Sequence, residues 1–476
     1  MWISRVGPPP DGERASLDEL RAAVAHLESL VGELRVLADE QTEVIAARDA
    51  RIKELEKLLD DARRSGKRQA APFSKGDPKE APAKPGRRSG KRHGRHGHRM
   101  APATIDRDLV APLPECCPDC GGEIEHLRDA EQFQTELPDT RPVTTRFRVR
   151  VGRCMKCRRR IQGRHPEQTS DALGAAGSML GPHARNFATW LHYALGLSFG
   201  KTAGVLGHLG VPVTAGALSS GAQATGTALA PLYGEIVARI NDAPVVVPDE
   251  TGWRVGGEGA WLWVATTEGL VCYHVGATRG FEDATALVKK DYAGVVVRDG
   301  WIVYRGYEQA THQTCIAHLL RRAKHMETDN PDWARSTPRE VKDLLLSALA
   351  ARDLAQDERA EVVADLTERI ELLGEQSHPY EANRILVAHL LNEKDALFTF
   401  LTTDGVDATN WRAEQAIRPA VVNRKVCGGN RTWRGAATQG RIMSVLRTAV
   451  VRGVDPIEFL VRFARAPDPT AVSFFT

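Results

Sequence analysis

The sequence contains no apolar run that approaches the roughly 18 residues needed for a membrane-spanning helix. Its first residues, Met-Trp-Ile-Ser followed by two further residues, Gly and three prolines, lack the basic and apolar stretches of a secretory signal peptide. We therefore expect a soluble protein of the cytoplasm with no membrane partner.

The chain also has little net charge, +3, but this charge is unevenly distributed. Residues 63–100 contain 13 Lys and Arg against two acids, Asp77 and Glu80, so the segment carries +11 and the rest of the chain −8. The segment has too few apolar residues to fold alone, which predicts a disordered basic linker. Such a linker can follow a phosphate backbone; a merely solvated linker is the alternative.

Residues 17–59 have the heptad pattern of a coiled coil. Apolar residues recur every seven positions from Leu17 to Leu59, and a second series that begins at Leu20 is interrupted by Gln41 and Arg48. This alternation of three and four residues predicts a parallel dimer. A single helix packed on its own catalytic domain is the alternative.

Cysteine is scarce, with eight residues, but four of them form two Cys-x-x-Cys pairs separated by 33 residues. In a reducing compartment such pairs indicate metal binding or redox chemistry rather than structural disulfides, and four thiolates suit one structural Zn²⁺. With an alternating, strand-like segment at 144–151, the pattern predicts a zinc ribbon. The predicted ligands are Cys117, Cys120, Cys154 and Cys157, with Cys116 as an alternative to Cys117.

The residues around 183–240 predict helices at 183–195, at 201–209 and from Thr214 onward. A helix, a short turn with Gly and a second helix is the geometry of a helix-turn-helix unit. The second helix has almost no side chain that reads base edges, so a helical bundle that supports a catalytic domain is an equal alternative.

From residue 243 onward the pattern changes to strands. Three strands in a meander, a helix, a fourth strand and further α/β structure form, by analogy, the order of a ribonuclease H-like domain. The predicted strands are 244–247, 261–265, 271–275, 294–298 and 314–317, and the predicted helix is 281–290.

Two aspartates, Asp249 and Asp299, follow two of these apolar strands. Pro248 cannot donate to a ladder, so the first strand is expected to stop pairing there on at least one side. Carboxylates at such ends can converge and hold Mg²⁺, and two such ions can assist both oxygens of a phosphoryl transfer. A single Asp more often stabilises a turn; the matching pair favours metal binding.

Several motifs follow one another along the chain: Asp249-Glu250-Thr251, Asp299-Gly300-Trp301 with Tyr304, Cys315-x-x-His318-x-x-Arg321-Arg322, and Asn410-Trp-Arg-Ala-Glu414-Gln-Ala-Ile-Arg418-Pro419 before Arg424-Lys425. In this order they resemble the insertion sequence 66 family of transposases, and the coiled coil, basic linker and cysteine pairs extend the resemblance. Two positions depart from the family pattern: Trp411, where a second Asn is common, and Gln415, where Arg is usual.

The resemblance implies a DDE triad of Asp249, Asp299 and Glu414 that holds two Mg²⁺ or Mn²⁺ ions per active site. Glu414 lies 115 residues after Asp299, and apolar residues at helical spacing predict a helical insertion at 326–405 between them. Glu414 is then expected near the start of a helix capped by Asn410.

Basic residues beside these motifs are predicted to contact DNA. In the 424–441 segment, glycines are expected to let the backbone and cations approach phosphate closely. Cys315 and His318 are expected to pack and position rather than to form half of a second zinc site. The predicted DNA-binding residues are Arg158, Arg159, Arg160, Arg321, Arg322, Arg418, Arg424, Lys425, Arg431 and Arg434.

The sequence thus predicts an α/β ribonuclease H-like catalytic domain with a helical insertion, preceded by a coiled coil, a basic linker, a zinc ribbon and a small helical domain. The expected activity is Mg-dependent DNA transposition on element ends and target DNA, by a nucleoid-associated homodimer or higher oligomer with accessory proteins of the element. An inactive zinc-dependent DNA-binding dimer and a nuclease without strand transfer are the alternatives. The predicted boundaries are 1–64, 65–110, 111–165, 166–240, 241–325, 326–405 and 406–476.

Overall fold

The computed structural model describes residues 22, 24–36, 41, 102–137, 141–177 and 179–475. The chain divides into two units, residues 1–100 and 101–476, and each is described by itself. Among the described helices, none is long and apolar enough to cross a membrane.

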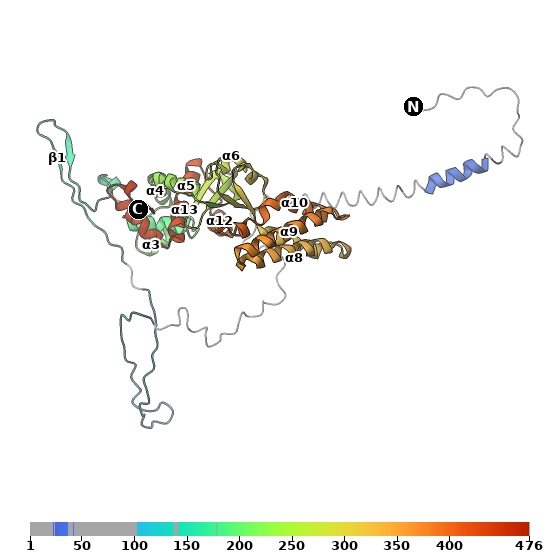
Figure 1. Ribbon diagram of the computed structural model, residues 1–476. Coiled ribbons are helices and arrows are strands. Elements are labelled where there is room, and N and C mark those ends of the chain that lie inside the picture. The colour runs from blue at the N-terminus through green and yellow to red at the C-terminus, as the bar shows by residue number, and fades with distance from the viewer. Residues whose placement is uncertain are drawn as a thin grey trace. The chain divides into compact units, whose positions relative to one another are not determined.

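In the first unit, residues 24–36 form a helix (Figure 1). Val24, Leu27, Val31 and Leu34 belong to the two predicted heptad series, and all four side chains are exposed in the single chain. This stretch therefore has the helical conformation and the apolar stripe that the coiled-coil prediction requires. Most of the predicted coiled coil and of the basic linker lies outside the described residues.

The second unit begins with segments that contain one short hairpin. β1 (Val151–Arg153) pairs antiparallel with β2 (Arg160–Gln162), and Val151 lies opposite Gln162. The strand predicted at 144–151 is therefore wrong in its extent, because β2 offers only three residues as pairing partners. A short 3-10 helix, η2 (Gly174–Gly177), precedes the helical region.

Four helices follow, and the first three agree with the helices predicted at 183–195, at 201–209 and from Thr214 onward. Ser198 and Thr214 begin the second and third of them, since their side chains accept hydrogen bonds from the backbone N–H groups of Lys201 and Ala217. The exposed positions of the third helix are all Ala, Gly, Ser or Thr, so it presents no cation to DNA. The helices are α2 (Pro182–Tyr193), α3 (Phe199–His208), α4 (Ala215–Ala228) and α5 (Ala230–Asn241).

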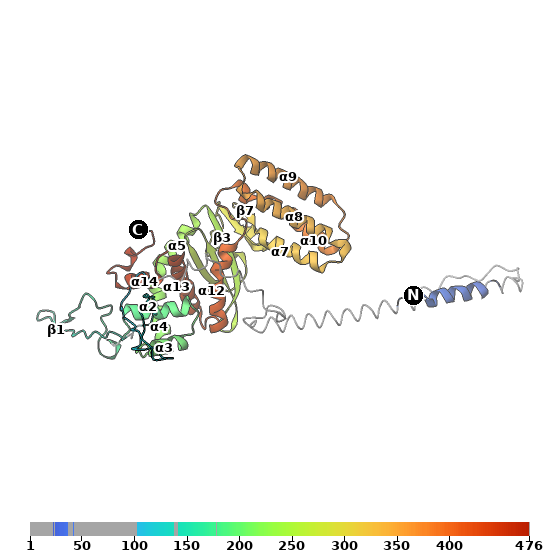
Figure 2. The ribbon, with the colours of Figure 1, turned by 90° about the horizontal axis from the view of Figure 1, so that it is seen from below.

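A five-stranded mixed sheet follows (Figure 2). The first three strands form an antiparallel meander, and the last two run parallel to the first, in the spatial order β5-β4-β3-β6-β7. Every residue of β6 is buried, as expected of a central strand with parallel neighbours. The strands are β3 (Val245–Val255), β4 (Glu258–Thr266), β5 (Val271–Gly276), β6 (Val295–Arg298) and β7 (Thr311–Thr314).

β3 does not end at Pro248, contrary to the shorter strand expected there. Its pairing with β4 continues from Val247 to Val255, whereas its pairing with β6 stops at Val246, two residues before the proline. The expectation that pairing stops on one side is confirmed, because proline has no N–H to donate. The expectation that the strand itself ends there is wrong.

The helix predicted at 281–290 is shorter than expected, since α6 covers only Phe281–Ala284. Asn241 at the end of α5 explains the early stop. Its side-chain amide donates to the carbonyl of Leu287 and its side-chain oxygen accepts from the N–H of Lys289, which holds this stretch outside a helix.

The fifth strand lies three residues earlier than predicted, since β7 covers Thr311–Thr314 and includes the polar residues His312 and Gln313. Gln313 of β7 is buried, donates to the carbonyl of Leu397 and accepts from the N–H of Phe400. A buried polar side chain is stable when its hydrogen bonds are satisfied in this way.

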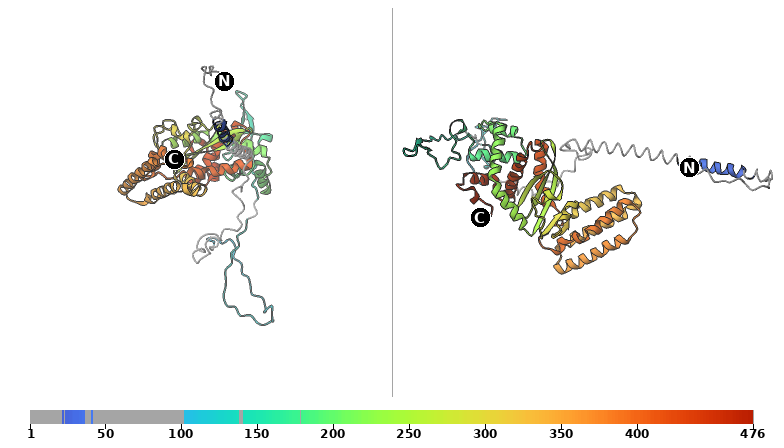
Figure 3. Two further views of the ribbon diagram at one scale, coloured as in Figure 1. Left: turned by 90° about the vertical axis from the view of Figure 1, so that its right-hand side faces the viewer. Right: turned by 90° about the horizontal axis from the view of Figure 1, so that it is seen from above.

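Between β7 and the last helices, four long helices lie side by side next to the sheet (Figures 2 and 3). They bury apolar side chains such as Leu344, Ile370 and Leu386 against one another, as the helical spacing predicted. The helices are α7 (Ile316–Asp329), α8 (Ser336–Ala350), α9 (Gln356–Glu375) and α10 (Glu381–Leu397), with α11 (Thr399–Thr402) and the 3-10 turns η4 (Asp332–Ala334) and η5 (Ala351–Asp353).

The last helices cover the sheet, and the second of them protects its edge. The hydroxyl of Ser444 accepts a hydrogen bond from the N–H of Tyr273. The hydroxyl of Thr448 accepts one from the N–H of Val271 and donates one to the carbonyl of the same residue. The free edge of β5 is thereby capped by side chains. The helices are α12 (Trp411–Cys427), α13 (Trp433–Val451) and α14 (Pro456–Arg465), followed by η6 (Pro469–Ala471).

Candidate active site

Asp249 and Asp299 lie at the same level of two neighbouring parallel strands. β3 and β6 pair through Val246 and Val296, and each aspartate is three residues beyond its paired valine. Because the described pairing stops at these valines, the strands leave room between the two carboxylates. Asp249 is within β3 rather than after it, while Asp299 directly follows β6, as predicted.

The turn after β6 fixes Asp299. Its carboxylate accepts a hydrogen bond from the N–H of Trp301 at 2.9 Å, which is the local turn contact typical of aspartate. Gly300 between them lies against α10, because a Cβ there would come within 3.1 Å of His389.

Glu414 lies in the first turn of α12, as predicted, and its backbone N–H donates to the carbonyl of Asn410. The side chain of Asn410 makes no capping hydrogen bond, so the predicted cap is correct in position only. Instead, the backbone N–H of Asn410 donates to the thiol of Cys315, and His318 Nε2 lies 3.6 Å from Glu414 Oε1. The Cys315-x-x-His318 motif therefore positions the start of α12, as expected.

The three acids influence one another electrostatically. Burial, the charge of Glu250 and the charges of Asp299 and Glu414 raise the pKa of Asp249 to about 7, although a hydrogen bond from the N–H of Glu250 acts against the rise. In the described part of the chain, no ion pair involves Asp249 or Asp299, and that of Glu414 is with His318. Asp249 and Asp299 thus lie in a region of negative charge, and no Lys, Arg or His of the described residues forms an ion pair with either of them.

This donor set fits a hard divalent cation, because Mg²⁺ prefers a few carboxylates and keeps its other positions for water and phosphate oxygens. A cation among these acids would favour the charged form of Asp249, whose pKa burial and like charges now raise. Among the described residues, no three His, Cys, Asp or Glu side chains are gathered tightly enough to hold a metal ion as they stand.

A cluster on the other side of β3 was not predicted from the sequence. The buried carboxylate of Glu250 accepts from Arg279 at 2.6 and 2.9 Å and from the hydroxyl of Tyr304. The Arg279 guanidinium also lies 3.8 Å from the ring centre of Trp301 and 4.7 Å from that of Trp261. Arg279 therefore joins Glu250, the residue after Asp249, to Trp301, which is two residues after Asp299.

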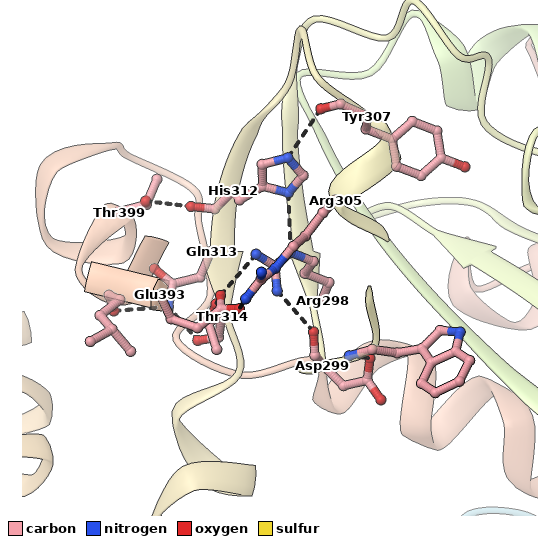
Figure 4. Close-up of polar contacts among 11 residues, drawn as sticks. Arg298, Asp299, Arg305, Tyr307, His312, Gln313, Thr314, Glu393 and Thr399 are labelled. Atoms are coloured by element: carbon pink, nitrogen blue, oxygen red, sulfur yellow. Dashed lines mark hydrogen bonds and ion pairs between the residues drawn. The ribbon is translucent and has the colours of Figure 1, made fainter. Parts of the chain in front are cut away.

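A second unpredicted cluster connects the helical insertion to the end of β6 (Figure 4). Buried Glu393 of α10 accepts from Arg298 at 2.8 Å, from Arg305 at 2.5 Å and from the hydroxyl of Thr314. Burial alone would raise the pKa of Glu393, but these donors lower it to about 2. Because Arg298 also donates to the backbone carbonyl of Asp299, this ion pair holds the residue that carries the second acid.

Most of the basic residues predicted to contact DNA are exposed, but Arg424 is half-buried. Its guanidinium donates to the hydroxyl of Thr251 and to the carbonyl of Gly252, so it ties α12 to β3. The exposed residues are Arg158, Arg159, Arg160, Arg321, Arg418, Lys425, Arg431 and Arg434; Arg322 is partly exposed.

One glycine of the 424–441 segment, Gly429, is required by a close contact within the chain itself. Gly429 has a φ of +100°, and a Cβ there would lie 2.4 Å from the carbonyl oxygen of Arg254. The N–H of Asn430 donates to the same carbonyl, and its side-chain oxygen accepts from the indole of Trp253. The close approach at Gly429 is therefore to the end of β3.

The two cysteine pairs have the same backbone turn. The N–H of Cys117 donates to the carbonyl of Gly122 and that of Cys154 to the carbonyl of Arg159, and the fourth residue after the start of each turn, Gly121 or Arg158, has a positive φ. Backbone N–H groups lower the pKa of both first thiols. Cys117, not Cys116, thus occupies the position equivalent to Cys154. The described thiols do not form one four-ligand group.

Comparison with known proteins adds a family and one relative. A family model described as "Transposase IS66 family" matches residues 177–438, more than half of the chain, and this range includes all three acids. The chain is 26% identical over 313 residues to "Uncharacterized protein y4qI" of Sinorhizobium fredii (strain NBRC 101917 / NGR234). The match covers 56% of each protein, so the chain spans about half the length of this relative.

The buried ion pair of Glu393 gives a testable pH dependence. We expect Glu393→Gln to lower the free energy of unfolding by roughly 3–5 kcal/mol at pH 7, because it leaves Arg298 buried without its counter-charge. The pKa of Glu393 is about 2 in the folded chain against an ordinary 4.5. Its stabilising effect is therefore complete above pH 4.5 and is lost as the pH falls toward 2.

Urea unfolding of both chains at pH 7 and pH 3 measures this difference. Glu381→Gln is the matched control, since Glu381 begins the same helix but is largely exposed, and it should change stability by less than about 1 kcal/mol. A destabilisation by Glu393→Gln that is equal at both pH values would contradict the assignment.

Proposed function

The chain belongs to the IS66 family of transposases, and from this premise we propose that it cuts DNA strands at the ends of an insertion element and joins them to target DNA. The main observation behind the proposal is that Asp249 and Asp299 lie at the same level of two parallel strands. Glu414 is close enough to Asp249 to raise its pKa. The meander of three strands followed by two parallel strands supports a ribonuclease H-like catalytic domain.

In this proposal Asp249, Asp299 and Glu414 hold two Mg²⁺ or Mn²⁺ ions. Bound ions of this kind stabilise the charge that develops on the attacking and leaving oxygens of an in-line displacement. Glu414 also orients the attacking water, and His318 beside it restrains the carboxylate. In cleavage, water attacks the phosphorus and one phosphodiester bond breaks, which leaves a 5′ phosphate and a 3′ hydroxyl. This hydroxyl then attacks a phosphodiester of the target, so that a new phosphodiester bond forms and a 3′ hydroxyl of the target strand is released.

Exposed cations near these acids would hold the phosphate backbone. Arg321 lies on α7 after the Cys315-x-x-His318 motif, and Arg418 is one helical turn from Glu414 on α12. Each neutralised phosphate releases counterions, so binding should weaken as salt rises. Arg424 would act indirectly, because it is already bound to β3.

We further propose that the two cysteine turns share one structural Zn²⁺ and that the N-terminal helix self-associates. The matching turns and the N–H groups directed at Cys117 and Cys154 support a metal-binding role. The exposed stripe on residues 24–34 supports a coiled coil. Holding two element ends together requires at least two copies of the chain.

Catalysis is tested with the purified chain, linear DNA that carries the element's ends, a supercoiled target, and either Mg²⁺ or a chelator. We expect metal-dependent joined products, reduced by more than about 100-fold in Asp249→Asn, Asp299→Asn and Glu414→Gln, since even residues behind metal ligands contribute 10- to 100-fold. Asp291→Asn, an exposed aspartate at the other end of β6, is the matched control and should remain active.

Each other outcome selects an alternative function. Cleavage without joined products would favour a nuclease, and binding of the ends without any chemistry would favour an inactive DNA-binding protein. Full strand transfer by both Asp249→Asn and Glu414→Gln would refute the proposed triad.

Zinc binding is tested by measuring the metal content of the purified chain. We expect one Zn²⁺ per chain, lost in Cys117→Ser and Cys154→Ser because three thiolates no longer complete a tetrahedral site. Cys116→Ser is the matched control and should retain the metal. Equal zinc content in Cys116→Ser and Cys117→Ser, whether high or low, would rule out the assignment of Cys117.

Self-association is tested by light scattering on the chromatographed chain. We expect a dimer or higher oligomer, and a smaller species when Leu27 and Leu34 are both replaced by Asp, since charge in the apolar seam opposes packing. Val36→Asp is the matched control, because Val36 is equally exposed but lies off the stripe. An unaltered chain that is already monomeric would refute the coiled coil.

A further inference from the structure

Trp411 is an exposed aromatic residue on the helix that carries Glu414 of the proposed active site. It is the first residue of α12, and 42% of its surface is exposed. Glu414 follows three residues later, and residues three apart on a helix are neighbours on its surface. Trp411 and the residue that is proposed to orient the attacking water therefore lie one turn apart on the same side of α12.

The indole is held in place rather than free to rotate. Its Nε1–H donates to Asp407 at 3.1 Å, and Arg412 donates to the same carboxylate oxygen at 2.9 Å while its guanidinium lies 5.2 Å from the indole centre. Arg352 of the helical insertion pairs with the other oxygen of Asp407 at 3.4 Å. Because the ring is already ordered, a partner that stacks on it loses less entropy on binding.

A nucleobase is the partner whose chemistry fits this position. Every base has a flat π-face that stacks on an aromatic ring whatever its sequence, and a base must accompany any phosphate that reaches Glu414. Inside a duplex both faces of a base are already stacked on neighbours. The base that meets Trp411 must therefore be unstacked, which costs least at a nucleotide that is already unpaired.

We propose that Trp411 is a base-stacking residue that holds one unpaired nucleotide next to the phosphate that is cut. This inference rests on the proposed function, since it takes DNA to be the substrate of the carboxylates. Asp407 is then a positioning residue that sets the angle of the indole.

The test compares two DNA probes that differ only in the presence of a base. One is a duplex that ends in a short unpaired tail, and the other has abasic sites in the tail. Binding of the full chain to each is measured by fluorescence anisotropy with Ca²⁺ in place of Mg²⁺. We expect the unaltered chain to prefer the tail with bases by about 5- to 150-fold, the range for stacking one base on an aromatic side chain.

Two variants and a control separate stacking from folding. Trp411→Ala should abolish the preference, whereas Trp411→Phe should keep most of it because the ring remains. Trp333→Ala is the control, since Trp333 is 66% exposed but lies on the helical insertion, and it should keep the full preference. A partly unfolded variant binds both probes less well by the same factor, so the ratio of affinities still reports stacking.

The outcomes distinguish this inference from the proposed function. No preference in the unaltered chain, or an unchanged preference in Trp411→Ala, would overturn the inference even if strand transfer is observed. A preference that depends on the aromatic ring would support it even if the chain cuts no DNA with Mg²⁺, in which case the proposed function alone fails.

Discussion

The short parallel contact between β3 and β6 is the constraint on which the proposed site depends. Only two residue pairs join the strands, Val245 with Val295 and Val246 with Val296. Their register sets Asp249 level with Asp299, and the end of the pairing opens the space between them. A slip by one residue would turn one of the aspartates to the opposite face of the sheet. The buried valines that fix this register thus also determine the site.

The helical insertion also helps to position the acids of the proposed site. Glu393 of α10 reaches the end of β6 and binds Arg298, whose guanidinium also contacts the backbone of Asp299. Further along, Asp407 joins η5 of the insertion to the start of α12, near Glu414. The long chain segment between the second and third acids therefore ends in contacts that position both of them.

Patterns within a few residues were sufficient to predict much of this arrangement. The strands β4, β5 and β6, the helical insertion and the helix that carries Glu414 all follow from local periodicity. The predictions failed where a distant partner decides the outcome. Asn241 stops α6 from 46 residues away, and Arg254 requires Gly429. The pairing of Glu393 with Arg298 and that of Arg424 with β3 cannot be predicted from the local sequence, because such contacts form only when the chain folds.

The distribution of counter-charges separates two kinds of acid in this region. Glu250 and Glu393 are buried and each pairs with arginine, so these two carboxylates have a structural role. Asp249, in contrast, is partly buried among Asp299, Glu414 and Glu250, and its pKa rises because the surroundings oppose its charge. Burying a charge without a partner costs free energy that folding alone does not recover. Among the described residues, arginines pair with the two buried glutamates and no cation pairs with either aspartate, which is the arrangement that the proposed binding of a divalent cation requires.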